Sequence, residues 1–125
     1  MSTLNQRLAA LESSSGTGGG IIIKPVAMAK VGATGINERV ANCSVLKTGV
    51  GTFTFSFASP RPTSNYVISL SVAEFDSSRD DIIIQVAQNS TSVNGFRYTI
   101  HEQDNSDNAG TLIDKPSFVL VTDFD

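Results

Sequence analysis

The side chains that could carry nucleophilic or metal chemistry are few, because the chain has one histidine, His101, and one cysteine, Cys43. It contains no serine-nucleophile elbow, no phosphate-binding P-loop and no GxGxxG motif. A lone cysteine cannot close an intrachain disulfide or anchor a common zinc site. His101 is predicted to be a surface or interface histidine, although three copies around a symmetry axis could converge on a metal. We predict that the chain is not an enzyme and carries no cofactor.

A group of carboxylates is the alternative source of catalysis. Glycoside cleavage needs two carboxylates roughly 5–10 Å apart, and Glu74, Asp76, Asp80 and Asp81 could supply such a pair. Carboxylates that cluster in a turn are more often only solvated. A depolymerase is therefore a rival hypothesis that the sequence disfavours.

Residues 104–110 are rich in Asp and Asn and have some features of a calcium-binding loop. Gly110 falls one position late for such a loop, and Lys115 stands where a bidentate glutamate is required. We therefore predict no metal site in this segment.

Charge is spread unevenly along the chain, whose formal net charge is −3. Residues 101–125 carry six of the twelve acidic side chains against the single base Lys115. No basic stripe is present that could neutralise phosphates, so nucleic acid is not an expected partner. The N-terminus lacks an apolar signal-peptide segment, and no run approaches the roughly 18 apolar residues of a membrane span. We expect a soluble protein that does not insert into membranes.

From residue 21 onward the pattern is typical of an all-β protein. Short β-branched and aromatic runs alternate with turn signals about every ten residues, which predicts an antiparallel β-sandwich over residues 21–125. Six or seven strands are expected, at 21–31, 36–47, 52–58, 66–75, 82–88, 96–102 and 117–122.

The clearest strand is 52–57, where alternation sends Phe53, Phe55 and Phe57 to one face as a wall of the core. Residues 21–23 and 82–84 are instead isoleucine on both faces. Such strands must be covered on both sides, either by a partner subunit or by ordinary burial within the sandwich.

Turn residues separate these strands. The segment 48–51 supplies glycines for positive φ, residues 59–65 form a proline-braced connection, and Asn94-Gly95 predicts a two-residue hairpin turn. Asn42 and Asn89 begin Asn-x-Ser/Thr triplets. Asparagine is common in turns, and that role is sufficient to account for both residues.

The first thirteen residues predict a short helix with one apolar stripe, Leu4, Leu8 and Leu11. In a parallel coiled coil, Arg7 and Glu12 would occupy the g and e positions that pair between adjacent chains. A helix this short is not stable alone in water, so its stripe must be buried. Residues 14–20 form a flexible Ser/Gly-rich linker. Self-association or docking into a larger assembly is favoured, with packing on the chain's own domain or disorder as the alternatives.

The stretch 49–67, GVGTFTFSFASPRPTSNYV, resembles a pattern of glycines, alternating aromatic residues, a proline (here Pro62) and a tyrosine. This pattern is found in the small C-terminal heads of tailed-bacteriophage tail fibres. The glycine-rich turn at 32–35, the strand around 40–45 and the closing strand 118–121 are also similar. The family usually carries tryptophan in its first strand, where this chain has Ala27-Met-Ala29.

The resemblance implies a homotrimeric virion fibre with a jelly-roll-like β-sandwich head. Residues 1–13 would form a trimeric coiled-coil stem that attaches to tail or baseplate proteins, and the head would bind a host-surface receptor, commonly a glycan. The alternative is a structural virion protein, such as a capsid decoration or baseplate component, without a receptor.

Sugar binding by small proteins relies on a few polar groups of exposed loops. The candidates for receptor binding in this chain are the polar residues Arg79, Asp80, Asp81, Arg97, His101, Asn105, Asp107 and Asn108.

Overall fold

The computed structural model describes residues 23–73, 82–102 and 110–124. The predicted stem (1–13) and linker (14–20) lie outside these ranges, and so do the candidate site residues 79–81 and 105–108. The described residues form nine strands and no helix: β1 Ile23–Val31, β2 Asn37–Ala41, β3 Cys43–Gly49, β4 Thr52–Phe57, β5 Val67–Val72, β6 Ile82–Val86, β7 Gly95–Glu102, β8 Thr111–Leu112 and β9 Ser117–Phe124. In these ranges no helix is present that could cross a membrane.

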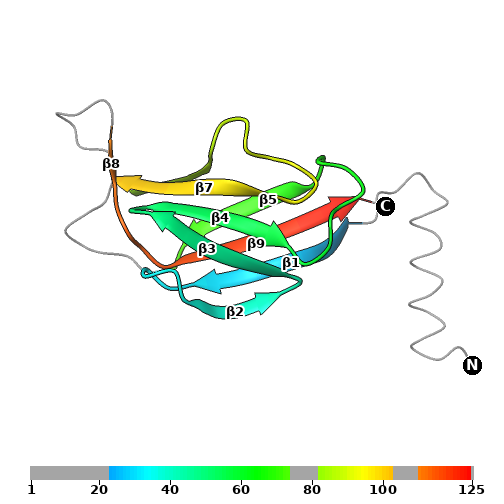
Figure 1. Cartoon of the computed structure of the whole chain (residues 1–125), viewed down its shortest axis with the longest axis horizontal. Coiled ribbons are helices and arrows are strands. Elements are labelled where there is room, and N and C mark those ends of the chain that lie inside the picture. The colour runs from blue at the N-terminus through cyan, green and yellow to red at the C-terminus, as the bar shows by residue number, and fades with distance from the viewer. Residues whose placement is uncertain (1–22, 74–81, 103–109, 125) are drawn as a thin grey trace, which may run out of the picture.

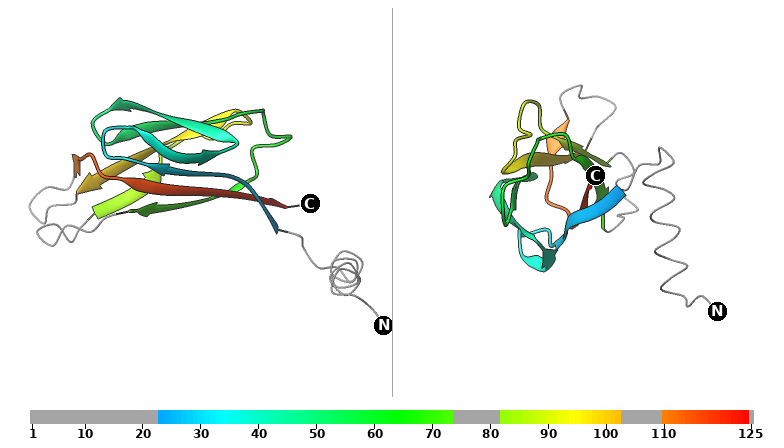
Figure 2. Two further views of the ribbon diagram at one scale, coloured as in Figure 1. Left: turned by 90° about the horizontal axis from the view of Figure 1, so that it is seen from below. Right: turned by 90° about the vertical axis from the view of Figure 1, so that its right-hand side faces the viewer.

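The strands make two antiparallel sheets, consistent with the predicted β-sandwich (Figures 1 and 2). One sheet has the order β2-β1-β9-β5, and the other has the order β3-β4-β7-β6 with the short β8 on β7. Apolar side chains from both sheets fill the space between them. We call these the β9 sheet and the β4 sheet, after their central strands.

The predicted strand 36–47 is two strands, because the chain turns at Asn42 and passes from the β9 sheet to the β4 sheet. Asn42 has a φ of 61°, and its side-chain amide donates to the carbonyl of Val26. Asparagine tolerates this left-handed conformation better than most residues. The apolar pattern continues across the corner, so periodicity alone did not show the break.

The phenylalanine wall is confirmed. Phe53 and Phe55 are fully buried, and Phe57 packs against the same core. Phe53 stacks on Tyr98 with ring centroids 5.1 Å apart, and Phe55 stacks on Phe96 at 4.6 Å. Each stacked pair is a direct cross-strand pair of β4 and β7, so the aromatic rings also hold the register of these strands.

The described chain enters and leaves the sandwich at one end, because Ile23 and Phe124 pair at the edge of the β1–β9 ladder. Figure 1 shows the ends of β1 and β7, near Val31 and Glu102, at the opposite end. We call these the terminal end and the distal end. The strands therefore run along a molecular axis with two different ends.

The glycine positions explain the turns. Gly51 adopts a positive φ of 60° as predicted. The predicted two-residue turn is present but lies one residue earlier than Asn94-Gly95: Ser92 and Gly95 form a bridge around Val93 and Asn94, and Gly95 begins β7. Gly95 is required there because a Cβ atom would collide with the carbonyl oxygen of Phe55 on β4.

Of the isoleucine runs, Ile82 and Ile84 pack against the core as ordinary burial predicts. Ile83 faces away and pairs with His101 across β6 and β7, half-buried. Ile23 is exposed, and residues 21 and 22 lie outside the described ranges. Cover by a partner subunit remains a prediction.

Candidate functional site

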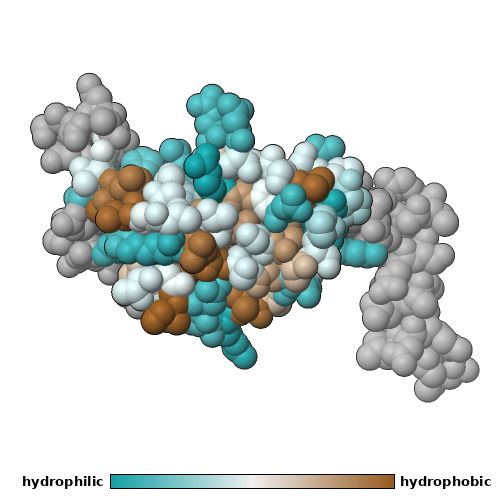
Figure 3. Space-filling model, in the orientation of Figure 1, coloured by the Kyte–Doolittle hydropathy of each residue, from teal (hydrophilic) through white to brown (hydrophobic). Residues whose placement is uncertain are grey.

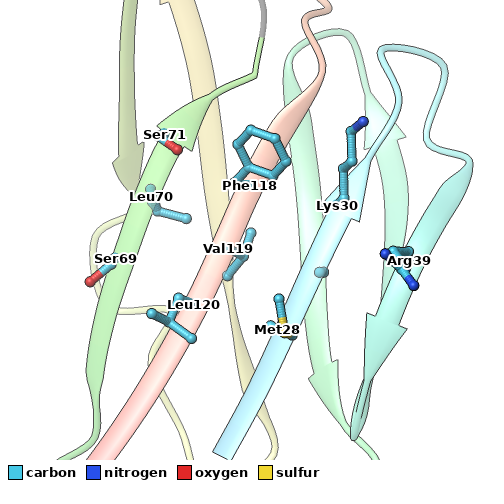
Figure 4. Close-up of a pocket in the computed structure, with 10 residues that line it drawn as sticks. Met28, Lys30, Arg39, Ser69, Leu70, Ser71, Phe118, Val119 and Leu120 are labelled. Carbon is cyan, nitrogen blue, oxygen red and sulfur yellow. The ribbon is translucent and has the colours of Figure 1, made fainter. Parts of the chain in front are cut away.

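An apolar groove of about 540 Å³ lies on the outer face of the β9 sheet (Figure 4). Its apolar lining is centred on Met28 of β1 and on Phe118 and Leu120 of β9. These side chains are 56%, 43% and 39% exposed, although methionine, phenylalanine and leucine are residues that a core would normally bury. The groove is therefore the main apolar feature on this face of the described domain.

Strand alternation places these three side chains on the same outer face. On β1, Ala27 and Ala29 point into the core and Met28 points out. On β9, Val119 and Val121 are buried while Phe118 and Leu120 face outward. β9 is thus apolar on both faces, whereas the outer face of an antiparallel sheet commonly carries polar side chains.

Cross-strand pairing sets the layout of the groove. Met28 and Ser69 lie on either side of Leu120, and Lys30 and Ser71 lie on either side of Phe118. The groove therefore has an apolar centre, with serines of β5 along one edge and charged residues along the other. Figure 4 shows these side chains as sticks on the neighbouring strands β5, β9 and β1.

The charged edge is formed by β1 and β2. The Lys30 ammonium lies 5.8 Å from the centre of the Phe118 ring and 3.5 Å from a Glu38 carboxylate oxygen. Arg39 pairs with Lys30 across the two strands and also lines the groove. This edge is basic overall.

The outer face of the β4 sheet is different. Its outward residues on β4 are the hydroxyl side chains Thr52, Thr54 and Ser56, and those on β7 include Arg97 and Thr99. Figure 3 shows this face as mainly intermediate to hydrophilic, with several separate apolar spots. Leu46, 66% exposed, is one such apolar side chain. The two outer faces therefore suit different kinds of contact.

Arg97 lines a recess of about 170 Å³ whose lining residues are mostly of polar types. Thr54, Ser56 and Asn94 also line it. The hydroxyl of Ser90 at its rim is engaged with the carbonyl of Ala87 and the backbone amide of Arg97. The guanidinium group of Arg97 is exposed and makes no ion pair with a described carboxylate. This recess offers donors to a polar ligand.

Only two of the predicted receptor-binding residues lie in the described ranges. Arg97 and His101 share the outer face of β7, as the alternation of that strand requires. They are four residues apart, or roughly 13 Å along the strand, so one small ligand cannot touch both. Arg97 lies near the start of β7, and His101 lies near its distal end, beside Gly110. The other six candidates are outside the described residues.

Several charged groups hold the fold together. Asp114 accepts a hydrogen bond from the Gly51 amide at 2.8 Å and pairs with Lys47 at 2.7 Å. These contacts lower the pKa of Asp114 from its ordinary value, the Gly51 bond having the larger effect. Arg61 pairs with Asp123 at 2.7 Å and ties the β4–β5 connection to β9. We assign these four charged side chains to stability.

Cys43 is half-buried, and its thiol donates to the carbonyl of Met28 at 3.3 Å. Burial raises the pKa of this thiol, which reduces the fraction of reactive thiolate. Across the described ranges, no three His, Cys, Asp or Glu side chains gather as a metal site would need.

Sequence reasoning did not select the groove residues Met28, Phe118 and Leu120. The signal was present in residues 118–121, which are apolar on both strand faces in the same way as 82–84. The sequence pattern alone predicts only a closing strand in that segment. No family model, curated protein or solved structure matches the chain.

Proposed function

We propose that this chain is a homotrimeric bacteriophage tail-fibre protein that attaches the virion to a host-surface glycan. Residues 21–125 are its non-catalytic, jelly-roll-like head. Residues 1–13 form a coiled-coil stem that binds tail or baseplate proteins, and residues 14–20 link stem and head.

The observation that carries the proposal is the position of Ile23. This residue lies at the terminal end of the sandwich, so a stem that precedes it would join the head at that end. The opposite end is then turned away from the virion. A head built in this way presents its distal end and its sides to a cell surface.

The surface properties support the same proposal. An exposed apolar face suits contact with further copies, and the polar recess at Arg97 suits a sugar. Guanidinium and hydroxyl groups are typical ligand-orienting groups in such sites. A small polar recess gives only weak binding by itself. Three sites on one fibre and several fibres on one particle would raise the overall avidity.

The test is a glycan array probed with the labelled full chain, after light scattering has shown its mass. A trimer that binds a set of related glycans is expected. Arg97→Ala should reduce that binding by about tenfold or more if the recess is the site, since it removes a charged hydrogen-bond donor. Gln85→Ala, an exposed change on the same sheet face, is the matched control and should leave binding unchanged.

A monomer, or a trimer without any glycan hit, would contradict the proposal. The second result together with tight binding to purified capsids would favour a capsid decoration protein. Release of reducing sugar from host polysaccharide would identify a depolymerase instead.

A further inference from the structure

From the groove geometry we infer that the outer face of the β9 sheet is the surface through which copies of this chain pack on one another, around an axis along the strands. The inference rests on the self-association in the proposed function, and it is independent of the receptor. It places the contact on Met28, Phe118 and Leu120, and not on the isoleucine strand 82–84.

The first support is the contrast between the two outer faces of one domain. Solvent-facing positions of β4 are Thr52, Thr54 and Ser56, whereas those of β9 include Phe118 and Leu120. Both strands are central in their sheets. Only the face of the β9 sheet has apolar side chains at its centre. Burial of that face in an assembly would explain this difference between the two faces.

The second support is the arrangement of residue types across the face. The apolar side chains lie on the central strands β1 and β9, and Arg39, Ser69 and Ser71 lie on the edge strands β2 and β5. Lys30 is on β1, beside Phe118. Stable protein interfaces have this organisation, with an apolar centre and a polar rim. Lys30 already lies over the Phe118 ring, so its stem can cover part of the apolar surface at the rim.

The third support is the area. The four strands of this sheet contain 28 residues. At about 3.3 Å per residue and about 4.8 Å between strands, their flat face measures roughly 440 Å². Two such faces would bury roughly 900 Å², without the additional surface of the protruding side chains. This is close to the roughly 1,000 Å² expected of a specific interface.

The edges also favour a second copy as the occupant. A rotation axis along the strands places the basic β1–β2 edge of one copy beside the β5 edge of the next, whose outward residues are Val67, Ser69 and Ser71. Lysine and arginine then meet hydroxyl groups and not like charges. An axis across the strands would bring Lys30 and Arg39 of both copies together, which costs energy.

The same axis agrees with the path of the chain. When strands of all copies run in the same direction, every Ile23 lies at the same end of the assembly. The preceding residues of all copies can then join one parallel stem. An antiparallel packing would send them to opposite ends.

The experiment measures self-association of the full chain by sedimentation equilibrium in two backgrounds. One has the natural sequence, and the other has Leu4, Leu8 and Leu11 all replaced by serine to disable the stem. We expect the second background to retain self-association. In that background Leu120→Glu should raise the Kd by more than about tenfold, because it places a charge in the apolar centre.

Leu46→Glu is the matched control, because it puts the same charge on the outer face of the β4 sheet and should leave the Kd unchanged. Leu120→Thr removes apolar surface without adding charge and should weaken association by a smaller factor. Thermal unfolding of each variant shows whether the head remains folded.

Equal effects of Leu120→Glu and Leu46→Glu on folded protein would overturn the inference. A disabled-stem chain that is monomeric while the natural chain is a trimer would also overturn it, and would leave the proposed fibre intact. A natural chain that is monomeric at every concentration would remove both.

Discussion

The hydroxyl groups of Tyr98 and Ser117 lie 2.8 Å apart inside the sandwich, where they form a hydrogen bond between the two sheets. Tyr98 is on β7 of the β4 sheet and Ser117 is on β9, and both are fully buried. A buried hydroxyl that loses its partner keeps the cost of desolvation. This pair therefore fixes how the two sheets stack as well as stabilising them.

Tyr98→Phe and Ser117→Ala should each lower the free energy of unfolding by about 1–3 kcal/mol, since each leaves the other hydroxyl unpaired. The double variant should cost less than the sum of the two single changes, because it removes both polar groups. Urea unfolding of the four proteins measures this coupling. Strict additivity would show that the hydrogen bond does not stabilise the fold.

Alkaline pH should destabilise the protein through the same tyrosine. Burial raises the pKa of Tyr98 from 10.0 to about 12, an effect only partly offset by the Ser117 hydrogen bond. Between these values an unfolded Tyr98 ionises and a folded one does not, so unfolding releases a proton. Stability should be intact below pH 10 and fall by about 1.4 kcal/mol per pH unit up to about pH 12. Tyr98→Phe should lack this component, and identical pH profiles would refute it.

The sequence was sufficient to predict the all-β class and the central strands. The alternation of Phe53, Phe55 and Phe57 fixes which face of β4 is buried, because exposing three phenylalanine side chains to water would cost a large free energy. Glycine and asparagine likewise marked where the chain reverses. Local pattern was enough wherever one residue type had only one favourable environment.

Two features required the three-dimensional structure. The corner at Asn42 is invisible to periodicity, because β2 and β3 continue one extended run on either side of it. The exposure of Phe118 and Leu120 likewise could not be predicted from the sequence, because phenylalanine and leucine are residue types that predict burial. It depends on which side of β9 the second sheet covers. The groove therefore had to be found from tertiary packing.

Acid should weaken the link between the β3–β4 turn and the segment before β9. The Gly51 hydrogen bond and Lys47 lower the pKa of Asp114. The stability it contributes is therefore present above its ordinary pKa of 3.8 and is lost as pH falls through the lower folded value. Asp114→Asn keeps an acceptor for Gly51 but cannot ionise. Between pH 6 and pH 2 the free energy of unfolding should fall more steeply with decreasing pH for the natural chain than for Asp114→Asn. Equal pH dependences of the two proteins would contradict this role.

Gly95 should be among the least replaceable residues of the head. It adopts a φ of 150°, and an added Cβ atom would collide with the carbonyl oxygen of Phe55, a backbone atom held in the β4–β7 ladder. Gly95→Ala should therefore lower the free energy of unfolding by about 3 kcal/mol or more, measured by urea unfolding.

Gly32→Ala is the matched control, because its Cβ would meet only ordinary contacts of 3.6 Å or longer. That variant should stay within about 1 kcal/mol of the natural chain. Similar losses for both glycines would show that chain entropy, not the contact with β4, selects glycine at position 95.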